Sequence, residues 1–262
     1  MKPSAREITD CHFHPAVDAD TDMGWFYRSG DAAAQVAALR RAGIARACGA
    51  PVRALAPAGF APIRAMNDGA LRLRDRFPGF YIPGIQIHPR FPDESCAEIA
   101  RCCGREGVRW VGELVGYMMG FGEEYASPAA LAVFREAARH GAAVNLHCDD
   151  LAVVESLCTA LPALNVVLAH PGAGRREIEP RVALVARLPN LHLDLSGSGI
   201  DRLGIVRQAV EQAGAHKILF GSDFPINNPA VYVHGVLFEE LPESVLTAVF
   251  GGNFQRLTAA AF

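Results

Sequence analysis

Four histidines and one aspartate stand where a metal-dependent enzyme would place its ligands. His12 and His14 form a His-x-His pair near the start of the chain, whereas His147, His170 and Asp223 each end an apolar run. Imidazole nitrogens and carboxylate oxygens bind divalent cations such as zinc at about 2.0–2.2 Å. Side chains at i and i+2 of a strand point to one side, so His12 and His14 can share a cation. A His-x-His pair alone also fits two buried histidines without metal, but the three further ligands favour a metal site.

Apolar runs of β-forming residues alternate with helical patterns along the chain, and these elements must position the five candidates. Turn residues such as Gly43, Gly107 and Gly141 separate them. The predicted strands are Ile8–Phe13, Ala45–Val52, Phe80–His88, Val108–Val115, Ala143–Cys148, Val166–His170, Leu191–Ser196 and Lys217–Asp223. The predicted helices are Ala32–Ala42, Ala65–Phe77, Cys96–Arg105, Ala129–His140, Leu151–Leu161, Arg181–Leu188 and Leu203–Ala213. This order is typical of βαβ units around a parallel sheet.

The number of strands and the positions of the ligands decide between a closed barrel and an open sheet. Eight predicted strands in 262 residues fit one (β/α)₈ barrel, which typically has about 250 residues. All five candidates come at the carboxyl ends of predicted strands, the face where barrel enzymes carry out catalysis. No internal repeat or linker divides the chain. We therefore predict a single α/β domain over residues 1–262, a TIM barrel.

Several motifs together resemble the amidohydrolase superfamily, in particular its amidohydrolase-related (amidohydrolase 2) branch. They are Asp10-Cys11-His12-Phe13-His14, His147, His170-Pro171, Phe220-Gly221-Ser222-Asp223-Phe224-Pro225 and Gly252-Asn253-Phe254-Gln255-Arg256-Leu257. The branch consists of metal-dependent TIM-barrel hydrolases and decarboxylases, including the aminocarboxymuconate-semialdehyde decarboxylase type. The resemblance implies that His12, His14 and Asp223 bind one metal. It also implies that His147 and His170 bind a second metal, or that His147 joins the first and His170 acts on the substrate.

Glu113 stands where the fourth strand is expected to end, in Trp110-Val111-Gly112-Glu113-Leu114. Many members of the superfamily carry there a lysine that becomes carbamylated and bridges two metals. This chain has lysine only at positions 2 and 217. We predict that Glu113 ligates or bridges the metals instead, as a glutamate does in the TatD-like deoxyribonuclease branch. The alternative is that Glu113 only hydrogen-bonds a ligand or a loop.

Asp223 and His170 are the candidate catalytic residues. A cation lowers the pKa of a bound water toward about 7, and a carboxylate beside that water can take its proton and pass it to the leaving group. We assign this role to Asp223; the alternative is that Asp223 is a metal ligand without a proton role. His170, if it does not bind metal, can polarise a carbonyl or move a proton.

Four further residues are candidates for substrate binding. His88 and Arg90 follow the third predicted strand and are expected at the same mouth of the barrel. The forked guanidinium of Arg90 suits a carboxylate and so indicates an acidic substrate; the alternative is a surface arginine. Tyr117 and Asn227 are the other pocket candidates. The loop Pro15–Gly30 is either a lid over the site or an ordinary surface loop.

Composition and charge argue against several classes of partner. The formal net charge is −3, the pI is about 6.3 and no long basic run occurs, so neither nucleic acid nor an anionic membrane is an expected partner. No apolar stretch reaches the roughly 18 residues of a membrane span. Residues Met1–Asp10 lack the apolar core of a signal peptide, and the seven scattered cysteines are typical of reduced thiols. We expect a cytoplasmic protein; its oligomeric state is open, a homo-oligomer included.

The sequence favours a hydrolase that attacks an amide, ester or lactone of a small, acidic molecule with metal-activated water. The alternative is a metal-dependent decarboxylase, a carbon–carbon lyase acting on a small aromatic or unsaturated acid. A TatD-like nuclease and a non-catalytic metal-binding barrel are further alternatives, and the acidic pI argues against the nuclease. The expected cofactor is zinc, one or two ions per chain, with manganese as the other candidate. Two metals bridged by Glu113 would favour hydrolysis, and one metal with His170 free would favour decarboxylation.

Overall fold

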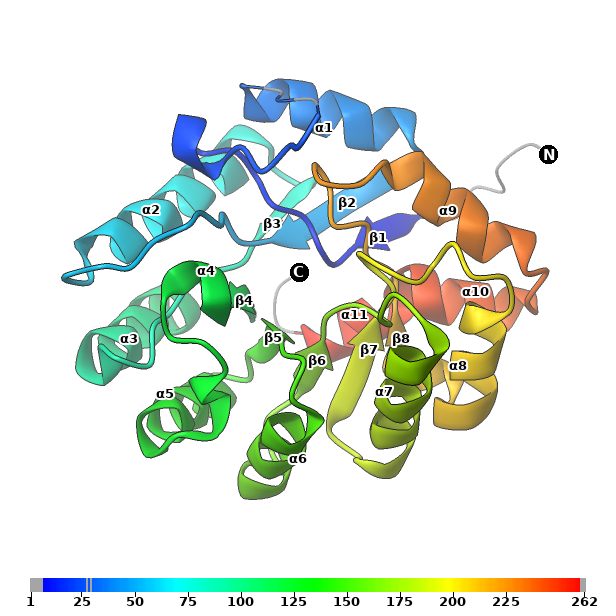
Figure 1. Ribbon diagram of the computed structural model, residues 1–262. Helices are drawn as coiled ribbons and strands as arrows, with labels where there is room; N and C mark the ends of the chain where they lie inside the picture. The colour runs from blue at the N-terminus through cyan, green and yellow to red at the C-terminus, as the bar shows by residue number, and fades with distance from the viewer. Residues whose placement is uncertain (1–6, 27, 29, 260–262) are drawn as a thin grey trace.

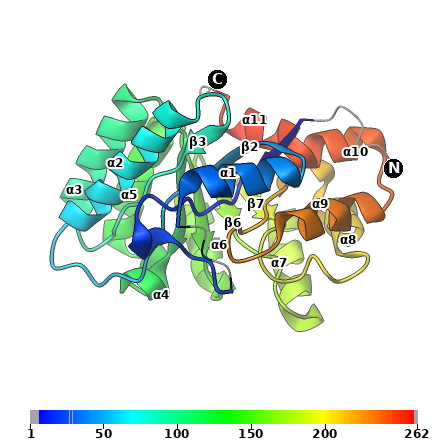
Figure 2. The same ribbon diagram turned by 90° about the horizontal axis from the view of Figure 1, so that it is seen from above.

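The computed structural model describes residues 7–26, 28 and 30–259, and in this part of the chain eight parallel strands alternate with helices (Figure 1). The strands are β1 (Ile8–Asp10), β2 (Ile44–Gly49), β3 (Tyr81–Pro83), β4 (Trp110–Val115), β5 (Ala143–His147), β6 (Val166–Leu168), β7 (Leu191–Asp194) and β8 (Ile218–Leu219). The helices are α1 (Ala32–Arg41), α2 (Ala61–Arg76), α3 (Pro92–Ile99), α4 (Gly116–Met119), α5 (Pro128–Arg139), α6 (Leu151–Ala160), α7 (Arg175–Arg187), α8 (Ile205–Ala213), α9 (Pro229–Phe238), α10 (Glu243–Thr247) and α11 (Asn253–Leu257). In Figure 2, α2, α3 and α5 lie on one side of the strands, and α8, α9 and α10 on the other.

Several helices begin where the sequence supplies a capping side chain. Asp31, Ser127 and Asp150 each accept a hydrogen bond from a backbone N–H in the first turn of α1, α5 and α6 respectively. Such a cap typically stabilises a helix by about 0.5–2 kcal/mol. Pro128 opens α5, at a position where the N–H that proline lacks would have no partner inside the helix.

The two sheets of the barrel are joined at both edges. One sheet has the order β1-β2-β3 and the other β4-β5-β6-β7-β8, with every pair parallel. A bridge between Ile85 and Val111 joins the segment after β3 to β4, and a second bridge joins the segments that follow β1 and β8. Beside this second bridge, the N–H of Asp223 donates to the carbonyl of His12 at 2.9 Å. Barrel closure therefore brings two predicted ligands together from opposite ends of the sequence.

A small apolar cluster fills the inside of the barrel, separate from the larger core between strands and helices. On β6, Val167 belongs to the inner cluster, and its two strand neighbours belong to the larger core, as the alternation of side chains requires. Trp110 of β4 packs there against Phe254 of α11, with ring centroids 5.3 Å apart. Asn253, also of α11, donates to the carbonyl of Ile218 at 2.8 Å, where β8 begins. Helix α11 thus covers the amino-terminal end, and the carboxyl ends are left for the site.

The predicted TIM barrel and the order of its strands are confirmed, but several elements differ at their ends. The strands are shorter, since the first ends at Asp10 and the eighth at Leu219. Helix α7 begins at Arg175 rather than Arg181, because the helix accommodates Pro180 in its interior. Helix α9 was not predicted, since its sequence is apolar on all sides and lacks a helical period.

All seven cysteines lie in the described part of the chain, and none forms a disulfide there. Six are buried, and Cys96 is partly exposed. Burial raises the pKa of the Cys102 and Cys103 thiols to about 12, so these adjacent cysteines stay protonated at neutral pH. No helix among the described residues is long and apolar enough to cross a bilayer.

Candidate metal centre and active site

A cavity of about 840 Å³ opens at the carboxyl ends of the strands and contains most of the predicted site residues. Its lining includes His14, Glu113, His147, His170 and Asp223. The rest of the wall comes mainly from the loops and short helices that follow β1, β4, β7 and β8. Its volume is within the roughly 300–1,000 Å³ of small-molecule sites.

The histidines and Asp223 reach the centre mostly from loops that follow the strands. His147 ends β5, as predicted. His12 and His14 come after the last residue of β1, and His170 and Asp223 come after the last residues of β6 and β8. All five therefore lie at the carboxyl ends of strands, as predicted, but His12, His170 and Asp223 lie just outside the strands that were predicted to contain them, because strand pairing stops before the chain turns into the loops. The His-x-His side chains still converge, with their Nε2 atoms 3.2 Å apart.

Glu113 lies inside β4 rather than at its end. The pairing register with β5 shifts around it, between Val111 and Leu114, which directs the Glu113 side chain into the barrel mouth. Gly112 makes this possible, since its φ is +100° and a Cβ there would lie 2.1 Å from the carbonyl oxygen of Asn145. The local geometry of Glu113 therefore depends on the glycine that precedes it.

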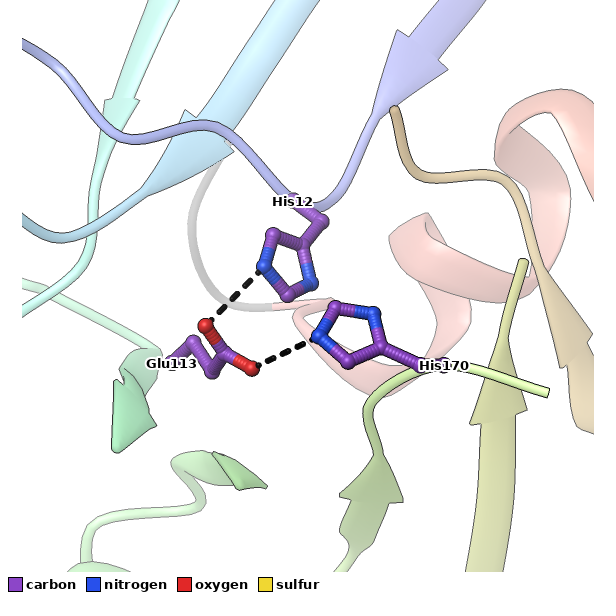
Figure 3. A group of neighbouring side chains, drawn as sticks. All are labelled: His12, Glu113 and His170. Atoms are coloured by element: carbon purple, nitrogen blue, oxygen red, sulfur yellow. Dashed lines mark ion pairs between the residues drawn. The ribbon is translucent and has the colours of Figure 1, made fainter. Parts of the chain in front are cut away.

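The Glu113 carboxylate lies between two groups of histidines, with one oxygen toward each. Figure 3 shows the two oxygens directed at His12 and His170. Oε2 is 3.2 Å from His12 Nε2 and 3.3 Å from His14 Nε2. Oε1 is 3.2 Å from His170 Nε2 and 3.4 Å from His147 Nδ1. These contacts fit the bridging role predicted for Glu113 better than contact with a loop.

Asp223 completes the first group of ligand atoms. Its Oδ1 is 3.2 Å from His14 Nε2 and 3.7 Å from His12 Nε2. Ligand atoms of His12, His14 and Asp223 all lie within 4.8 Å of one another, and so do those of His12, Glu113 and His170. His147 belongs to neither set, but it contacts Glu113, and its ring lies edge-on to that of His170 with centroids 5.0 Å apart. The two sets of candidate ligands share His12 and so form one buried centre.

The Nδ1 atoms of three histidines lie on the far side of the rings from the carboxylate and meet acceptors. His12 Nδ1 is 3.1 Å from Asp194 Oδ2 and 2.9 Å from Ser196 Oγ. His170 Nδ1 is 3.0 Å from the same Ser196 Oγ. For His14 the acceptor is a backbone carbonyl at 3.4 Å. A proton on each Nδ1 leaves each Nε2 lone pair free for a metal.

Burial and charge oppose each other throughout the centre. Burial lowers the pKa of His14, but Asp223 and Glu113 outweigh it and raise that pKa to about 9. Burial also lowers the pKa of His170, yet the Glu113 carboxylate raises it above its ordinary value. Burial raises the pKa of Glu113, and the imidazole of His12, with the other histidines, holds it well below its usual range. The two carboxylates thus attract positive charge, which a divalent cation supplies in place of several protons.

The donor set fits a divalent cation. Imidazole nitrogens with protonated Nδ1 atoms would turn lone pairs toward carboxylate oxygens, an arrangement that is repulsive unless a cation lies between them. Glu113 Oε1 is buried and makes no hydrogen bond, so it is a donor that a cation would satisfy. Nitrogen together with carboxylate oxygen suits zinc and also manganese.

Two of the candidate ligands have a left-handed backbone conformation that few residues other than glycine adopt. The φ angles are 67° at His170 and 58° at Asp223. Such conformations cost on the order of 1–3 kcal/mol and gather at functional sites. At Gly197, a Cβ would lie 2.2 Å from His170 Nδ1, so the chain leaves out a side chain where the imidazole ring packs.

Two of the four residues predicted to bind substrate line the cavity. Tyr117 is a lining residue, and its ring lies edge-on to the ring of His147 with centroids 5.3 Å apart. Asn227 is also a lining residue, and its Nδ2 donates to Asp223 Oδ2 at 3.0 Å. Asn227 therefore fixes one carboxylate oxygen of Asp223 and leaves Oδ1 facing the histidines.

The other two, His88 and Arg90, lie away from the lining of this cavity. His88 is buried and its Nε2 is 3.0 Å from the carbonyl of Met119. Arg90 is exposed and pairs with Glu124 at 2.7 Å. Helix α3 begins at Pro92, directly after these residues. The structure therefore does not bring His88 and Arg90 into the cavity that the other predicted site residues line.

The loop Pro15–Gly30 borders the cavity and gives its mouth an apolar character. Trp25, from this loop, lines the cavity although its side chain is 72% exposed. Tyr117 of α4 and Val231 of α9 also line it and are 68% and 54% exposed. Exposed apolar side chains thus gather where a substrate would enter.

Sequence reasoning missed Asp194, Ser196 and Arg202. A signal for the first two was available, because Leu191–Ser196 places polar residues at i and i+2 where an apolar strand ends, as in the His-x-His pair. Asp194 and Ser196 are fully buried, and Asp194 Oδ2 also accepts a hydrogen bond from Asn145 Nδ2 at 2.8 Å. Among the residues that line the cavity, Arg202 is the one lysine or arginine. Its sequence neighbourhood carries no signal of this position.

Comparisons with known proteins agree with the barrel fold and show the family of the chain. Residues 9–257 match the family described as Amidohydrolase. The structure of 5-carboxyvanillate decarboxylase from Sphingomonas paucimobilis is similar over 98% of this chain and 100% of that chain, with a TM-score of 0.71 and 16% identity. A search of the curated proteins found no match.

Two further solved structures are similar over nearly the whole chain. One is a dihydroxybenzoic acid decarboxylase from Polaromonas sp. JS666 with bound manganese and the inhibitor 2-nitroresorcinol, which aligns over 97% of both chains with a TM-score of 0.71 and 16% identity. The other is a putative 2-pyrone-4,6-dicarboxylic acid hydrolase from Pseudomonas putida, which aligns over 98% of both chains with a TM-score of 0.68 and 18% identity. These likenesses show the shared fold.

Proposed function

Because this chain belongs to the amidohydrolase family, a family of metal-dependent enzymes, we propose that it hydrolyses an ester, amide or lactone bond of a small acidic molecule with two divalent cations. The observation that carries the proposal is the position of Glu113, whose two carboxylate oxygens face separate groups of histidines. One cation would be held by His12, His14 and Asp223. The second would be held by His147 and His170, with Glu113 shared between both.

The residues of the centre then have distinct tasks. Bound cations would polarise the substrate carbonyl and lower the pKa of the attacking water toward about 7. The Asp223 carboxylate accepts the proton that the water loses and passes it to the leaving group. Asn227 holds Asp223 Oδ2 at 3.0 Å, which keeps Oδ1 turned toward the reaction. His170 and His147 contact Glu113 Oε1 and so hold that carboxylate oxygen in place between the two cation positions.

The lining of the cavity supports a small anionic substrate. Arg202, in the loop after β7, offers a guanidinium suited to a carboxylate, and a substrate carboxylate would compete there with its present partner Asp201. Trp25 and Tyr117 supply apolar area at the mouth. One arginine and no lysine among the lining residues is too little positive charge for a nucleic-acid backbone, so the lining gives no support to a nuclease.

A decarboxylase is the second candidate, and the similar solved structures support it more directly than they support hydrolysis. Two of the three carry the name of a decarboxylase of an aromatic acid, and one of these holds manganese. In this case a single cation would use His12, His14 and Asp223, and His170 would be free to act on the substrate. The apolar mouth and Arg202 suit an aromatic carboxylate as well.

A metal count combined with two assays separates the candidates. Purified protein is stripped of metal, titrated with zinc and in parallel with manganese, and its metal content is measured per chain. We expect two cations in the parent protein and a lower content in Glu113→Gln, whose amide is a poorer bridge. The loaded protein is then assayed on panels of carboxylated esters, amides and lactones for hydrolysis, and of aromatic acids for release of carbon dioxide. One cation per chain with carbon dioxide release would reject the two-cation hydrolase in favour of the decarboxylase.

A further inference from the structure

The seventh strand ends in a pair of buried polar residues that contact two candidate ligands at once. Asp194 ends β7, and Ser196 follows two residues later, so both side chains point to the same side. Ser196 Oγ lies 2.9 Å from His12 Nδ1 and 3.0 Å from His170 Nδ1. These histidines come from the segments that follow β1 and β6, and they face different oxygens of Glu113. β7 itself supplies none of the candidate ligands.

The hydrogen bonds of Ser196 can be assigned without leaving any group unsatisfied. A hydroxyl donates one hydrogen bond and accepts two. Ser196 donates to Asp194 Oδ1, and its two lone pairs accept the Nδ1–H protons of His12 and His170. The N–H of Ser196 donates to the same Oδ1 at 2.9 Å, so Asp194 accepts throughout. With this assignment, both imidazoles carry their proton on Nδ1 and present Nε2 to Glu113.

Asp194 is itself held in place from a second strand. Its Oδ2 accepts from Asn145 Nδ2 of β5 at 2.8 Å and lies 3.1 Å from His12 Nδ1. At Gly221, a Cβ would lie 2.7 Å from the Cβ of His12 and 3.1 Å from that of Ser196. A glycine at this position therefore allows the three segments to pack closely.

We propose that Asp194 and Ser196 form one positioning device on β7 that fixes the Nδ1 protons of His12 and His170 and thereby aims both Nε2 atoms at the metal positions. This inference rests on the metal centre of the proposed function and adds to it. The orientations of His12, in the first group of ligands, and His170, in the second, then both depend on the same atom, Ser196 Oγ. Asp194 and Ser196 are both positioning residues, since neither side chain contacts the cavity in which the substrate would bind.

Metal affinity is the first test. Ser196→Ala and Asp194→Asn are titrated with Zn²⁺ and with Mn²⁺ against a competing chelator. We expect an affinity about 10- to 100-fold lower than that of the parent protein, the usual effect of losing a hydrogen-bond partner of a ligand. Ser95→Ala is the matched control, since Ser95 is buried and its hydroxyl makes two hydrogen bonds with the backbone of His88. The control should bind both metals as the parent does. Parent-like affinity in both test variants would overturn the proposal.

Nitrogen-15 NMR of the histidine rings provides a readout that a general packing defect would not imitate. In the parent protein, the Nδ1–H signals of His12 and His170 should be protected from exchange with water. Ser196→Ala should remove the protection at His170, whose Nδ1 has Ser196 as its partner, and should leave it largely at His12, which keeps Asp194. Asp194→Asn should have its larger effect at His12. Protons found on Nε2 of these two rings in the zinc-loaded parent would contradict the assignment.

The failure of this inference can be told apart from failure of the proposed function. If the parent protein and the variants bind metal equally well, the positioning device is rejected and the metal centre stands. If the parent protein binds no metal, the proposed function is rejected. The Nδ1–H signals of the metal-free protein then still decide whether Ser196 and Asp194 hold the two rings. These signals are read in the parent protein, so the test does not depend on a variant that folds.

Discussion

At the scale of single residues, the centre is defined by which atom of each side chain faces the cation. One carboxylate oxygen of Glu113 faces each group of histidines. Asp223 Oδ1 faces His14, and Asp223 Oδ2 accepts a hydrogen bond from Asn227. In His12, His14 and His170, Nδ1 contacts a hydrogen-bond acceptor of the protein and Nε2 faces the centre of the site. His147 is the exception, since its Nδ1 faces Glu113. Changes of one atom should therefore have large effects at these positions.

Asp223→Asn is the sharpest such change. The amide keeps the size and one oxygen, but it cannot accept the proton that the attacking water loses. At matched metal occupancy we expect kcat to fall by about 100-fold or more, while a competitive product analogue binds nearly as before, because the loss is in the transition state. Initial rates and inhibitor titrations on both proteins check this. An Asn variant with a rate within a few-fold of the parent, at full metal occupancy, would reduce Asp223 to a ligand.

Arg202 and Arg90 give opposite expectations for substrate recognition. Both arginines are exposed and paired with a carboxylate, Arg202 with Asp201 and Arg90 with Glu124, but Arg202 alone of the two lines the cavity. Arg202→Ala should raise KM for carboxylated substrates by roughly 10- to 100-fold, the value of a charged hydrogen bond of about 1.5–3 kcal/mol. Arg90→Ala should change KM little. Steady-state kinetics with a carboxylated substrate and its methyl ester decide, and the reverse order of effects would restore the sequence-based assignment of Arg90.

At the scale of elements, a chain of buried hydrogen bonds connects the outer helices to the strand that carries Glu113. Glu98 of α3 accepts from Asn67 of α2 at 3.0 Å. Asn67 in turn accepts from the N–H of Gln86 at 2.7 Å. Gln86 Nε2 donates to the carbonyl of Glu113 at 2.8 Å. The backbone at Glu113 is thus held from the α2–α3 side of the barrel.

Glu98 should make the stability of this side depend on pH. Burial raises the pKa of Glu98, but the hydrogen bonds from Arg101 and Asn67 outweigh it and lower the pKa below its ordinary value of 4.5. Because the folded pKa is lower than the unfolded one, the stabilisation is present above about pH 4.5 and is lost as the pH falls through the folded pKa. Glu98→Gln should therefore cost about 1–3 kcal/mol at neutral pH, with a smaller cost in acid.

Urea unfolding of the parent and of Glu98→Gln, from pH 7 down to the lowest pH at which the protein folds, measures this difference. Glu94→Gln on the same helix is the control, since Glu94 is exposed. Its free energy of unfolding should stay close to that of the parent at every pH. A Glu98→Gln penalty that does not shrink in acid would show that the loss comes from packing and not from the charge.

At the scale of the whole molecule, the candidate ligands come from or after β1, β4, β5, β6 and β8, which belong to both sheets of the barrel. A cation bound there links the two sheets across the mouth and should stabilise the folded chain. With free metal at 100 times Kd, the gain is about 2.7 kcal/mol. For a chain of this length, that corresponds to a rise in Tm of roughly 5–10 °C.

Melting curves with and without zinc, and after treatment with a chelator, measure this linkage. His12→Ala should lose the metal-dependent part of Tm, because its ligand set is incomplete. His216→Ala should keep it, because His216 lies before β8, at the opposite end of the barrel. A His12→Ala protein that still gains stability from zinc as the parent does would refute the assignment of His12 as a ligand.

The sequence by itself determined the barrel, the order of its strands and the candidate residues of the metal centre. The strand period, the turn residues and the polar residues at the ends of apolar runs are local properties, and His12, His14, His147, His170 and Asp223 all carried such a signal. Glu113 was found through a resemblance, since within its strand it has a local signal no stronger than that of a surface glutamate.

The tertiary structure decided the contacts between residues far apart in the chain. Ser196 meets His12 only because the barrel closes, and no local pattern records a contact across 184 positions. The same holds for Arg202, which the loop after β7 brings to the cavity, and for Arg90, which lies outside the lining. A sequence pattern fixes the side of an element on which a residue lies, whereas the path of a loop depends on the packing of the elements that it joins.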